Sequence, residues 1–193
     1  ALLTGSNKIK TAVFISGTGS NLENLINFSL IKKSPIEINF VLSNNSTAKG
    51  LDFAKKYKIK KKIFKFKKQI TDENKIITYL KKNNIKLICL AGFMKILSKN
   101  FIQKFDGIIL NIHPSLLPKY KGLNTHEKVI KNKEKFSGCT VHFVNSKLDS
   151  GEIILQKRIK ISKSETPKSL AKRILKQEHI LYPKALIKVL SNL

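Results

Sequence analysis

The sequence predicts a single-domain α/β fold with a mostly parallel central sheet and helices on both faces. Short apolar runs typical of buried strands alternate with segments whose apolar residues recur at helical spacing. The chain has 193 residues and is 41% hydrophobic, enough for one domain with a substantial core. The last two expected strands follow each other without a helix between them, so one of them should be antiparallel.

The elements expected in the first half of the chain follow this alternation. Strands are expected at residues 9–15, 36–42, 59–66 and 85–90, and helices at residues 22–30, 51–55 and 71–84. Asp72 and Glu73 stand in the first turn of the last of these helices, where the helix dipole favours acidic groups. Residues 85–90 form a continuous apolar run, which indicates a strand buried on both faces.

The second half is expected to start with a short helix that Ser98 caps and that runs to Phe105. A strand at residues 107–110, a helix at 125–131 and strands at 136–144 and 152–161 should follow. Thr166 and Pro167 are a good cap and first residue for a final helix that reaches about Leu190.

The formal net charge of +26 raises the hypothesis of nucleic-acid binding. Of the 38 basic residues, however, only Arg158 and Arg173 are arginines. Arginine is the preferred residue for forked contacts with bases and phosphates, and lysine runs are usually solvated. We therefore expect no specific nucleic-acid partner, although a general attraction for small polyanions remains open.

Several broader features concern the setting of the protein. Cys89 and Cys139 lie in apolar, strand-like contexts and are expected to be buried thiols of a cytoplasmic protein. No apolar run approaches the roughly 18 residues of a membrane span. Residues 1–8 are expected to be an N-terminal extension, of processed or cloning-derived origin, before a domain at residues 9–193.

The segment from Asn111 to Pro118 is the leading candidate for a functional site. It follows an apolar strand, and we expect Asn111 and His113 to be carried off the strand end into a turn stiffened by two prolines. Ligands of open α/β sheets bind beyond the carboxyl ends of the strands. An amide and an imidazole there suit carbonyl recognition and proton transfer. A purely structural turn with a surface histidine is about as plausible from this segment alone.

The turn from Gly17 to Leu22 is a candidate anion site. It resembles a dinucleotide-binding fingerprint but has Leu22 at the third glycine position, and no Walker lysine follows. Glycines, a hydroxyl and an amide at the start of a helix suit a single phosphate, held by Gly19, Ser20 and Asn21. The alternative is a tight strand-to-helix turn capped by the asparagine.

Further candidates are isolated acids. Asp149 follows a predicted strand and could orient an imidazole, though loop aspartates usually form turns. Glu178 lies in the final helix and could grip an amine or simply be a surface acid. Ser115 lacks the strand-to-helix elbow of a serine nucleophile. No histidine or cysteine pair has metal-ligand spacing, so we expect no metal.

Taken together, these segments resemble the folate-dependent phosphoribosylglycinamide formyltransferases of purine biosynthesis. The likeness runs from about residue 9 to residue 186 and rests on six segments: 15–22, 90–97, 111–120, 141–143, 148–151 and 177–179. The resemblance implies a Rossmann-like formyltransferase fold and an enzyme that moves a formyl group from 10-formyltetrahydrofolate to the amine of glycinamide ribonucleotide.

The resemblance also implies roles for residues. Asn111, His113 and Asp149 would be catalytic, with Asn111 and Asp149 also contacting the folate. The ribonucleotide would be held by Gly19, Ser20, Asn21 and Glu178, and the pterin by Met94, Lys95, Ile96 and Leu97. The expected partners are the two substrates. No membrane association is expected, and the protein should be a monomer or a homodimer.

Two departures from the family pattern stand out. Lys95 replaces a frequent arginine and cannot make its forked contact. Gln69 lies near the position of another family arginine, and we assign it no role. The alternatives are a methionyl-tRNA formyltransferase, whose additional C-terminal domain would not fit in 193 residues, and a basic nucleic-acid-binding module.

Overall fold

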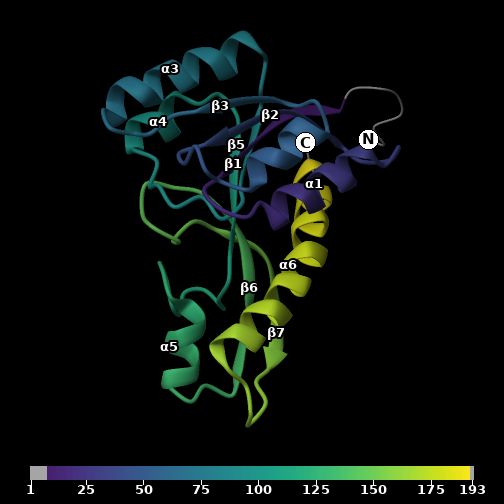
Figure 1. The fold of residues 1–193 in the computed structure, drawn as a ribbon, viewed down its shortest axis with the longest axis vertical. Coiled ribbons are helices and arrows are strands. Elements are labelled where there is room, and N and C mark those ends of the chain that lie inside the picture. Colours follow the sequence, from purple (N-terminus) through teal and green to yellow (C-terminus); the bar gives the residue numbers. More distant parts are fainter. Residues whose placement is uncertain (1–7, 192–193) are drawn as a thin grey trace. The chain divides into compact units, whose positions relative to one another are not determined.

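The computed structural model describes residues 8–191, which form two compact units that divide between Leu110 and Asn111. All but the last residue of the expected extension at residues 1–8 lies outside the described part. The hydrogen-bonded strand order is β3-β2-β1-β4-β5-β6-β7. Figure 1 shows the fold as a ribbon on which most of the elements are labelled.

The elements of the first unit alternate strictly between strand and helix. They are β1 (Ile9–Ile15), α1 (Ser20–Leu30), β2 (Ile36–Ser43), α2 (Gly50–Lys56), β3 (Lys60–Ile63), α3 (Gln69–Lys82), β4 (Leu87–Leu90) and α4 (Lys99–Lys104), followed by the start of β5 (Ile108–His113). β1 pairs in parallel with β2 and β4, and β2 pairs in parallel with β3. Crossovers between parallel strands are right-handed, and the strand order reverses direction after β3. Therefore α1 and α2 cover one face of this unit's sheet, and α3 and α4 cover the other.

The edge strand β3 carries the sequence Lys60-Lys61-Lys62-Ile63, and all four residues are exposed. A short edge strand rich in lysine is a poor template for another chain, because pairing would bring like charges together. The lysines of β3 thus protect a sheet edge from aggregation. This role explains them without a nucleic-acid partner.

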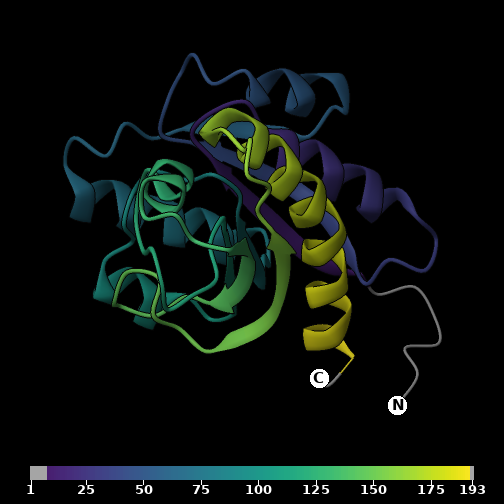
Figure 2. The ribbon, with the colours of Figure 1, turned by 90° about the horizontal axis from the view of Figure 1, so that it is seen from below.

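The second unit contains the end of β5 and a hairpin-like pair of strands covered by a long helix. Its elements are α5 (Thr125–Lys131), β6 (Phe136–Phe143), β7 (Ile153–Lys160) and α6 (Pro167–Leu190). β6 and β7 are antiparallel, as the missing helix between them predicts, and α6 packs on both (yellow in Figure 2). Thr166 caps α6: its hydroxyl accepts a hydrogen bond from the N–H of Ser169, 3.1 Å away.

One boundary differs in a way that matters for the site. We expected the strand before the leading candidate segment to end at residue 110, with Asn111 and His113 in the following turn. That prediction is wrong, because β5 continues to His113 and both residues belong to the strand. A polar residue in a strand can still be satisfied by neighbouring side chains, so polarity alone did not mark the strand end.

The turn between β1 and α1 depends on a close approach of two glycines. Gly19 has φ +76°, and a Cβ atom on it would lie 2.4 Å from the Cα of Gly50. A Cβ on Gly50 would in turn meet Gly19 Cα at 2.8 Å and Ile15 Cδ1 at 2.6 Å. The start of α2 therefore rests directly on this turn, and glycine is needed on both sides.

We predict that Gly50→Ala lowers the free energy of unfolding by about 1–3 kcal/mol, since overpacking outweighs the better helix propensity of alanine. Gly17→Ala is the matched control, because nothing lies within 4 Å of a Cβ built there. Chemical denaturation of both variants measures the difference. Equal stabilities would mean that the contact between the turn and α2 is not tight.

Candidate functional site

Asn111 and His113 stand two residues apart on β5, so their side chains project from the same face of the strand. His113 is buried, with 5% of its surface exposed, and Asn111 is partly buried. Burial of both polar groups means that each must find hydrogen-bond partners inside the protein. Although both residues lie on the strand and not in a turn, their side chains still point to the same side, because alternate residues of a strand share a face.

The segment after β5 folds back on His113. The backbone carbonyl of Tyr120 lies 2.8 Å from Nε2 of His113, and Tyr120 itself has a left-handed backbone with φ 56°. Ser115 holds this return by donating from its hydroxyl to the carbonyl of Lys119 at 2.7 Å. A carbonyl oxygen can only accept, so the Tyr120 contact assigns a proton to Nε2 of His113.

Asp149 completes the group. Its Oδ2 accepts a hydrogen bond from the N–H of Gly122 at 2.9 Å and lies 3.4 Å from Nδ1 of His113. Its Oδ1 accepts from Nδ2 of Asn111 at 3.4 Å. Asp149 has φ 44°, a left-handed conformation that aspartate tolerates at some cost. The structure thus brings together the three side chains that the sequence proposed as catalytic.

His142, on β6, is a fourth member that the sequence reasoning did not assign. Its Nδ1 lies 2.8 Å from the carbonyl of Phe143, which can only accept. Nε2 is then left to accept from Nδ2 of Asn111, 3.2 Å away. His142 therefore fixes which way the Asn111 amide points. Residues 141–143 are one of the segments that resemble the family, so the sequence did mark this position. It gave no reason, however, to assign His142 a role other than that of a core residue.

The burial of the group sets its protonation. Burial lowers the pKa of His113, and the Tyr120 carbonyl and the Asp149 charge oppose this only in part. Burial would raise the pKa of Asp149, but the His142 ring, the N–H of Gly122 and the His113 ring together hold that pKa below its ordinary value. A carboxylate beside a neutral imidazole is the resulting state near pH 7.

The candidate phosphate turn lies in the first unit. α1 begins at Ser20 directly after Gly19, and Asn21 is buried in the first turn of the helix. The N–H of Gly50 donates to the carbonyl of Gly17 at 3.0 Å, which holds the turn against α2. Glu23 also stands in the first helical turn. The turn has the geometry expected from the sequence, with N–H groups of a helix start beyond a strand end.

The candidate pterin segment follows β4 in the same unit. Ser16, at the end of β1, accepts a hydrogen bond from the N–H of Met94 at 2.7 Å and donates to Oδ1 of Asn44. The two hydrogen bonds of Ser16 thus join the segments that follow β1, β2 and β4. Met94 and Ile96 expose 61% and 60% of their surfaces, an unusual exposure for apolar residues held in a fixed loop.

Glu178 differs from a surface acid. It is 7% exposed on α6, a helix that packs against β6 and β7. Burial, together with the charge of Glu178, raises the pKa of the Cys139 thiol to about 12. Cys89 and Cys139 are both buried thiols that form no disulfide, as expected. A buried carboxylate in a helix otherwise used for packing favours a specific role over the surface reading.

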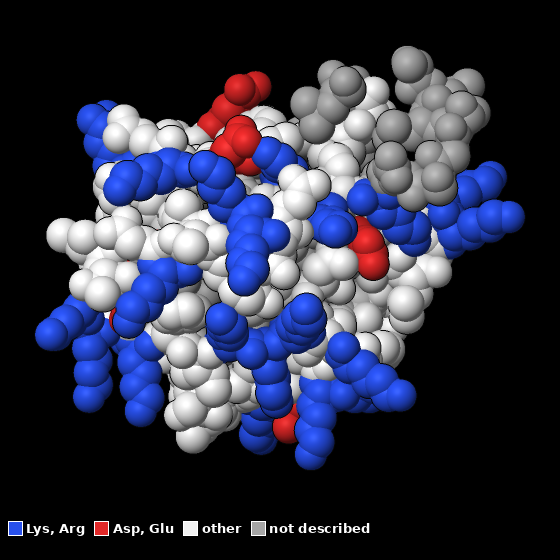
Figure 3. Space-filling view, turned by 90° about the horizontal axis from the view of Figure 1, so that it is seen from above, with Lys and Arg blue, Asp and Glu red and all other residues white. Residues whose placement is uncertain are grey.

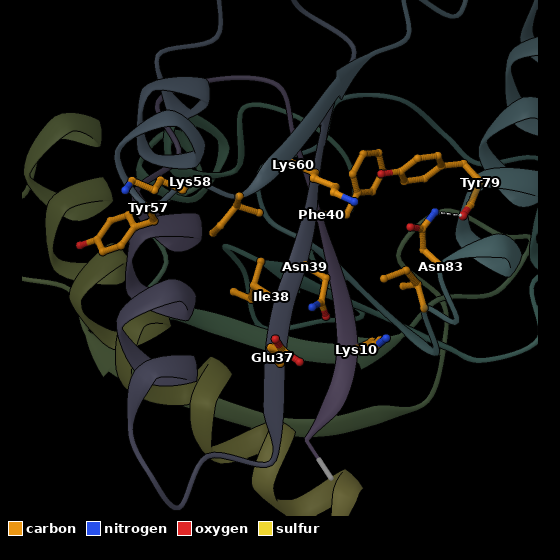
Figure 4. A pocket seen from close by; sticks show the side chains of 12 residues that line it. Lys10, Glu37, Ile38, Asn39, Phe40, Tyr57, Lys58, Lys60, Tyr79 and Asn83 are labelled. Atoms are coloured by element: carbon orange, nitrogen blue, oxygen red, sulfur yellow. Dashed lines mark hydrogen bonds between the residues drawn. The ribbon is translucent and has the colours of Figure 1, made fainter. Parts of the chain in front are cut away.

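A separate cavity in the first unit contains none of the predicted site residues. Figure 4 shows its lining at the beginnings of the strands, with Asn39 of β2 just above Lys10 in the view. Asn83 donates there to the carbonyl of Tyr79 at 2.8 Å. Ligands of open α/β sheets bind at the carboxyl ends of strands, whereas this cavity lies at the amino ends. We assign it no part in the site.

The described surface is strongly basic. In Figure 3 the lysine and arginine side chains are spread over the face in view, with uncharged surface between them. Within residues 8–191, no cluster of three or more histidine, cysteine or acidic residues could hold a metal ion. No helix in that range is long and apolar enough to cross a membrane.

Comparison with known proteins points in one direction. A family model described as formyl transferase matches residues 9–186. The phosphoribosylglycinamide formyltransferase of Haemophilus influenzae is 42% identical over 177 residues, which cover 90% of this chain and 84% of that protein. The human trifunctional purine biosynthetic protein adenosine-3 is 41% identical over 188 residues, or 96% of this chain. The chain spans 19% of the length of that human relative.

Solved structures agree with these relatives. The phosphoribosylglycinamide formyltransferase from Brucella melitensis superposes with a TM-score of 0.89 at 40% identity, covering 95% of this chain and 96% of that one. The enzyme from Anaplasma phagocytophilum gives a TM-score of 0.87 at 42% identity, covering 93% and 85%. The fold of this chain is therefore that of these enzymes.

The protonation of His113 has a measurable consequence for stability. Its pKa is lower in the folded protein than the roughly 6.5 of an unfolded chain, so the unfolded chain binds more protons as the pH falls below about 6.5. We predict that the unfolding free energy falls between about pH 6.5 and 5, and falls less steeply in His113→Gln, by up to about 1.4 kcal/mol per pH unit. Asp149, whose pKa is lowered, contributes stability that is lost only at lower pH, below about 4.

Urea denaturation at several pH values measures these slopes. Ser150→Ala serves as control, because it alters the residue next to Asp149 without removing a titrating group. An equal slope in wild type and His113→Gln would show that His113 is not held neutral by burial.

Proposed function

The chain belongs to the formyl transferase family, and on this premise we propose that it transfers the formyl group of 10-formyltetrahydrofolate to the primary amine of glycinamide ribonucleotide in purine biosynthesis. The observation that carries the proposal is the buried contact group of Asn111, His113 and Asp149. Its members are an amide donor, an imidazole and a carboxylate, which suit an amine attack on a carbonyl.

The reaction needs no covalent enzyme intermediate. The amine nitrogen forms a bond to the formyl carbon while the C=O electron pair moves to oxygen. The carbon–nitrogen bond to the folate then breaks, its electron pair goes to the folate nitrogen, which takes up a proton, and the attacking nitrogen loses one. Catalysis of this sequence requires stabilisation of the oxyanion and a place to hold a proton.

The contact group supplies both requirements. Nδ2 of Asn111 contacts His142 Nε2 and Asp149 Oδ1. In the proposed mechanism these two acceptors share one amide hydrogen, and the second hydrogen donates to the oxyanion. Nδ1 of His113 faces Asp149 Oδ2 at 3.4 Å, so a proton taken up there is stabilised by the carboxylate. The resulting imidazolium would stabilise negative charge on the formyl oxygen. Asp149 therefore orients one group and raises the basicity of the other.

Substrate binding is assigned to other elements. We propose that Gly19, Ser20 and Asn21 hold the phosphate of the ribonucleotide at the start of α1, and that Glu178 binds polar groups of the same substrate. Residues Met94–Leu97 would cradle the pterin, with Asn111 and Asp149 also contacting the folate. Backbone donors and acceptors of a loop can match the polar edge of a pterin.

The remaining assignments complete the proposal. The formyltransferase domain comprises residues 9–193, with residues 1–8 as an extension. The enzyme works without a metal, as a monomer or homodimer in the cytoplasm, and without a specific nucleic-acid partner. The lysine-rich surface, which Figure 3 shows spread over one face, favours only weak attraction for polyanions.

The proposal is tested by formyl transfer between the two pure substrates, followed through the formation of tetrahydrofolate. Transfer is expected with a chelator present. Transfer to methionyl-tRNA in place of glycinamide ribonucleotide, or activity that a chelator abolishes and added zinc restores, would contradict the proposal.

We predict that Asn111→Ala, His113→Ala and Asp149→Ala each reduce turnover by at least about a hundredfold, because each removes part of one electrostatic unit. The double variant Asn111→Ala/Asp149→Ala should lose much less than the product of the single losses. Thermal unfolding of each variant controls for folding. Near-normal turnover of His113→Ala would remove this residue from the mechanism.

We predict that Ser20→Ala raises the Michaelis constant for the ribonucleotide about five- to tenfold, the effect of losing one hydrogen bond to a charged acceptor. The constant for the folate should not change. Gly19 is a poorer test position, since its contact with Gly50 would disturb the turn itself.

Thr78→Val is the control for this experiment, because Thr78 is exposed on α3 and its hydroxyl bonds only its own helix among the contacts described. Titration of both substrates on each variant separates the two constants. A rise in the folate constant alone would assign the turn to the other ligand.

A further inference from the structure

We propose that Gln69 and Glu73 of α3 are positioning residues that fix the backbone of residues 94–98 in the conformation that receives the pterin. The inference rests on the proposed function of this segment. Nothing in the sequence assigned a role to Gln69, and Glu73 was interpreted only as an acid that favours the helix dipole.

Residues 91–98 contain neither helix nor strand, so no regular ladder of hydrogen bonds holds them. A segment of this kind with exposed Met94 and Ile96 would normally sample many conformations. A ligand that reads backbone groups would then bind weakly, since it must order the segment first. Side-chain contacts from neighbouring elements must supply the order.

Glu73 supplies the first of these contacts. Its side chain is completely buried on the inner face of α3. Oε1 accepts a hydrogen bond from the backbone N–H of Ser98 at 2.9 Å, and Oε2 accepts from the Ser98 hydroxyl. Ser98 in turn accepts from the N–H of Phe101 at 3.0 Å and so caps α4. The far end of the segment is thereby fixed to two helices.

Gln69 supplies the second contact, one helical turn earlier on the same side of α3. Its Nε2 donates to Oε1 of Glu73 at 3.0 Å and to the backbone carbonyl of Ile96 at 2.9 Å. An amide nitrogen has two hydrogens, and both are used here. Gln69 is itself exposed, so its position depends on Glu73 rather than on packing.

The two contacts determine where the backbone groups of the segment point. In a planar trans peptide the C=O and the following N–H point in opposite directions. The Ile96 carbonyl points to Gln69, so the N–H of Leu97 points away from α3. At the near end, the N–H of Met94 is held by Ser16. The donors and acceptors between these anchors therefore keep a fixed pattern.

The test compares Gln69→Leu with wild type. The substitution removes both donated hydrogen bonds at an exposed position, so the fold should survive with a melting temperature within about 2 °C of wild type. The Michaelis constant for 10-formyltetrahydrofolate should rise at least fivefold, whereas that for glycinamide ribonucleotide should stay within twofold. The dissociation constant of tetrahydrofolate, from calorimetry, should rise by the same factor.

Two further variants make the result specific. Gln69→Arg retains N–H donors for the Ile96 carbonyl and the Glu73 carboxylate and should restore folate binding to within about twofold of wild type. Ile70→Ala changes the neighbouring exposed residue of α3 and should leave both constants unchanged. Amide hydrogen exchange at residues 94–98 should accelerate in Gln69→Leu and not in Ile70→Ala.

Wild-type protein that neither transfers formyl nor binds tetrahydrofolate would contradict the proposed function. Active wild type together with unchanged folate constants in Gln69→Leu would overturn the positioning role alone. A parallel rise of both Michaelis constants, or a rise that Gln69→Arg does not reverse, would also overturn it, because a general loosening of the unit would then be responsible.

Discussion

The site depends on one carboxylate, Asp149, whose two oxygens have different partners. One oxygen is held by the N–H of Gly122 and faces His113, and the other accepts from Asn111. Desolvating a carboxylate is costly, and the surrounding donors and the imidazole offset that cost. Because the charge of Asp149 is buried, it orients the side chains of Asn111 and His113 that contact it. Removing the charge would take away the one group that contacts both Asn111 and His113.

Much of the fold follows from patterns of residues that are near in sequence. The strand at residues 9–15, the helix at 125–131 and the Thr166 cap are confirmed as expected, because apolar periodicity and capping are local properties. β5 was predicted too short because Asn111 and His113 are polar. The amide of Asn111 is satisfied by His142 and Asp149, 31 and 38 positions away, which a local pattern does not reveal.

The contacts within the candidate site were predictable only in part. Motifs identified Asn111, His113 and Asp149, and the structure brings all three together. His142 was missed because its contribution lies in the direction of one ring nitrogen, which its carbonyl partner determines. The contact of Gly19 with Gly50 was missed for a similar reason: spacing marks a flexible turn, but only the packed structure shows what approaches it. In the first unit, the segment after β4 gains order from Ser16 and Glu73, whose side chains accept hydrogen bonds from its backbone N–H groups.

The central claim is that the Tyr120 carbonyl sets the tautomer of His113 and that the charge of Asp149 raises its basicity. Nitrogen-15 NMR of histidine-labelled protein, recorded across pH for wild type and Asp149→Asn, tests this most directly. The account predicts that at pH 7.5 the proton of neutral His113 resides on Nε2 in the wild type, and that Asp149→Asn lowers the pKa of His113 further, because the stabilising charge is lost. A proton on Nδ1 in the wild type, or a His113 pKa that is the same in both proteins, would contradict the account.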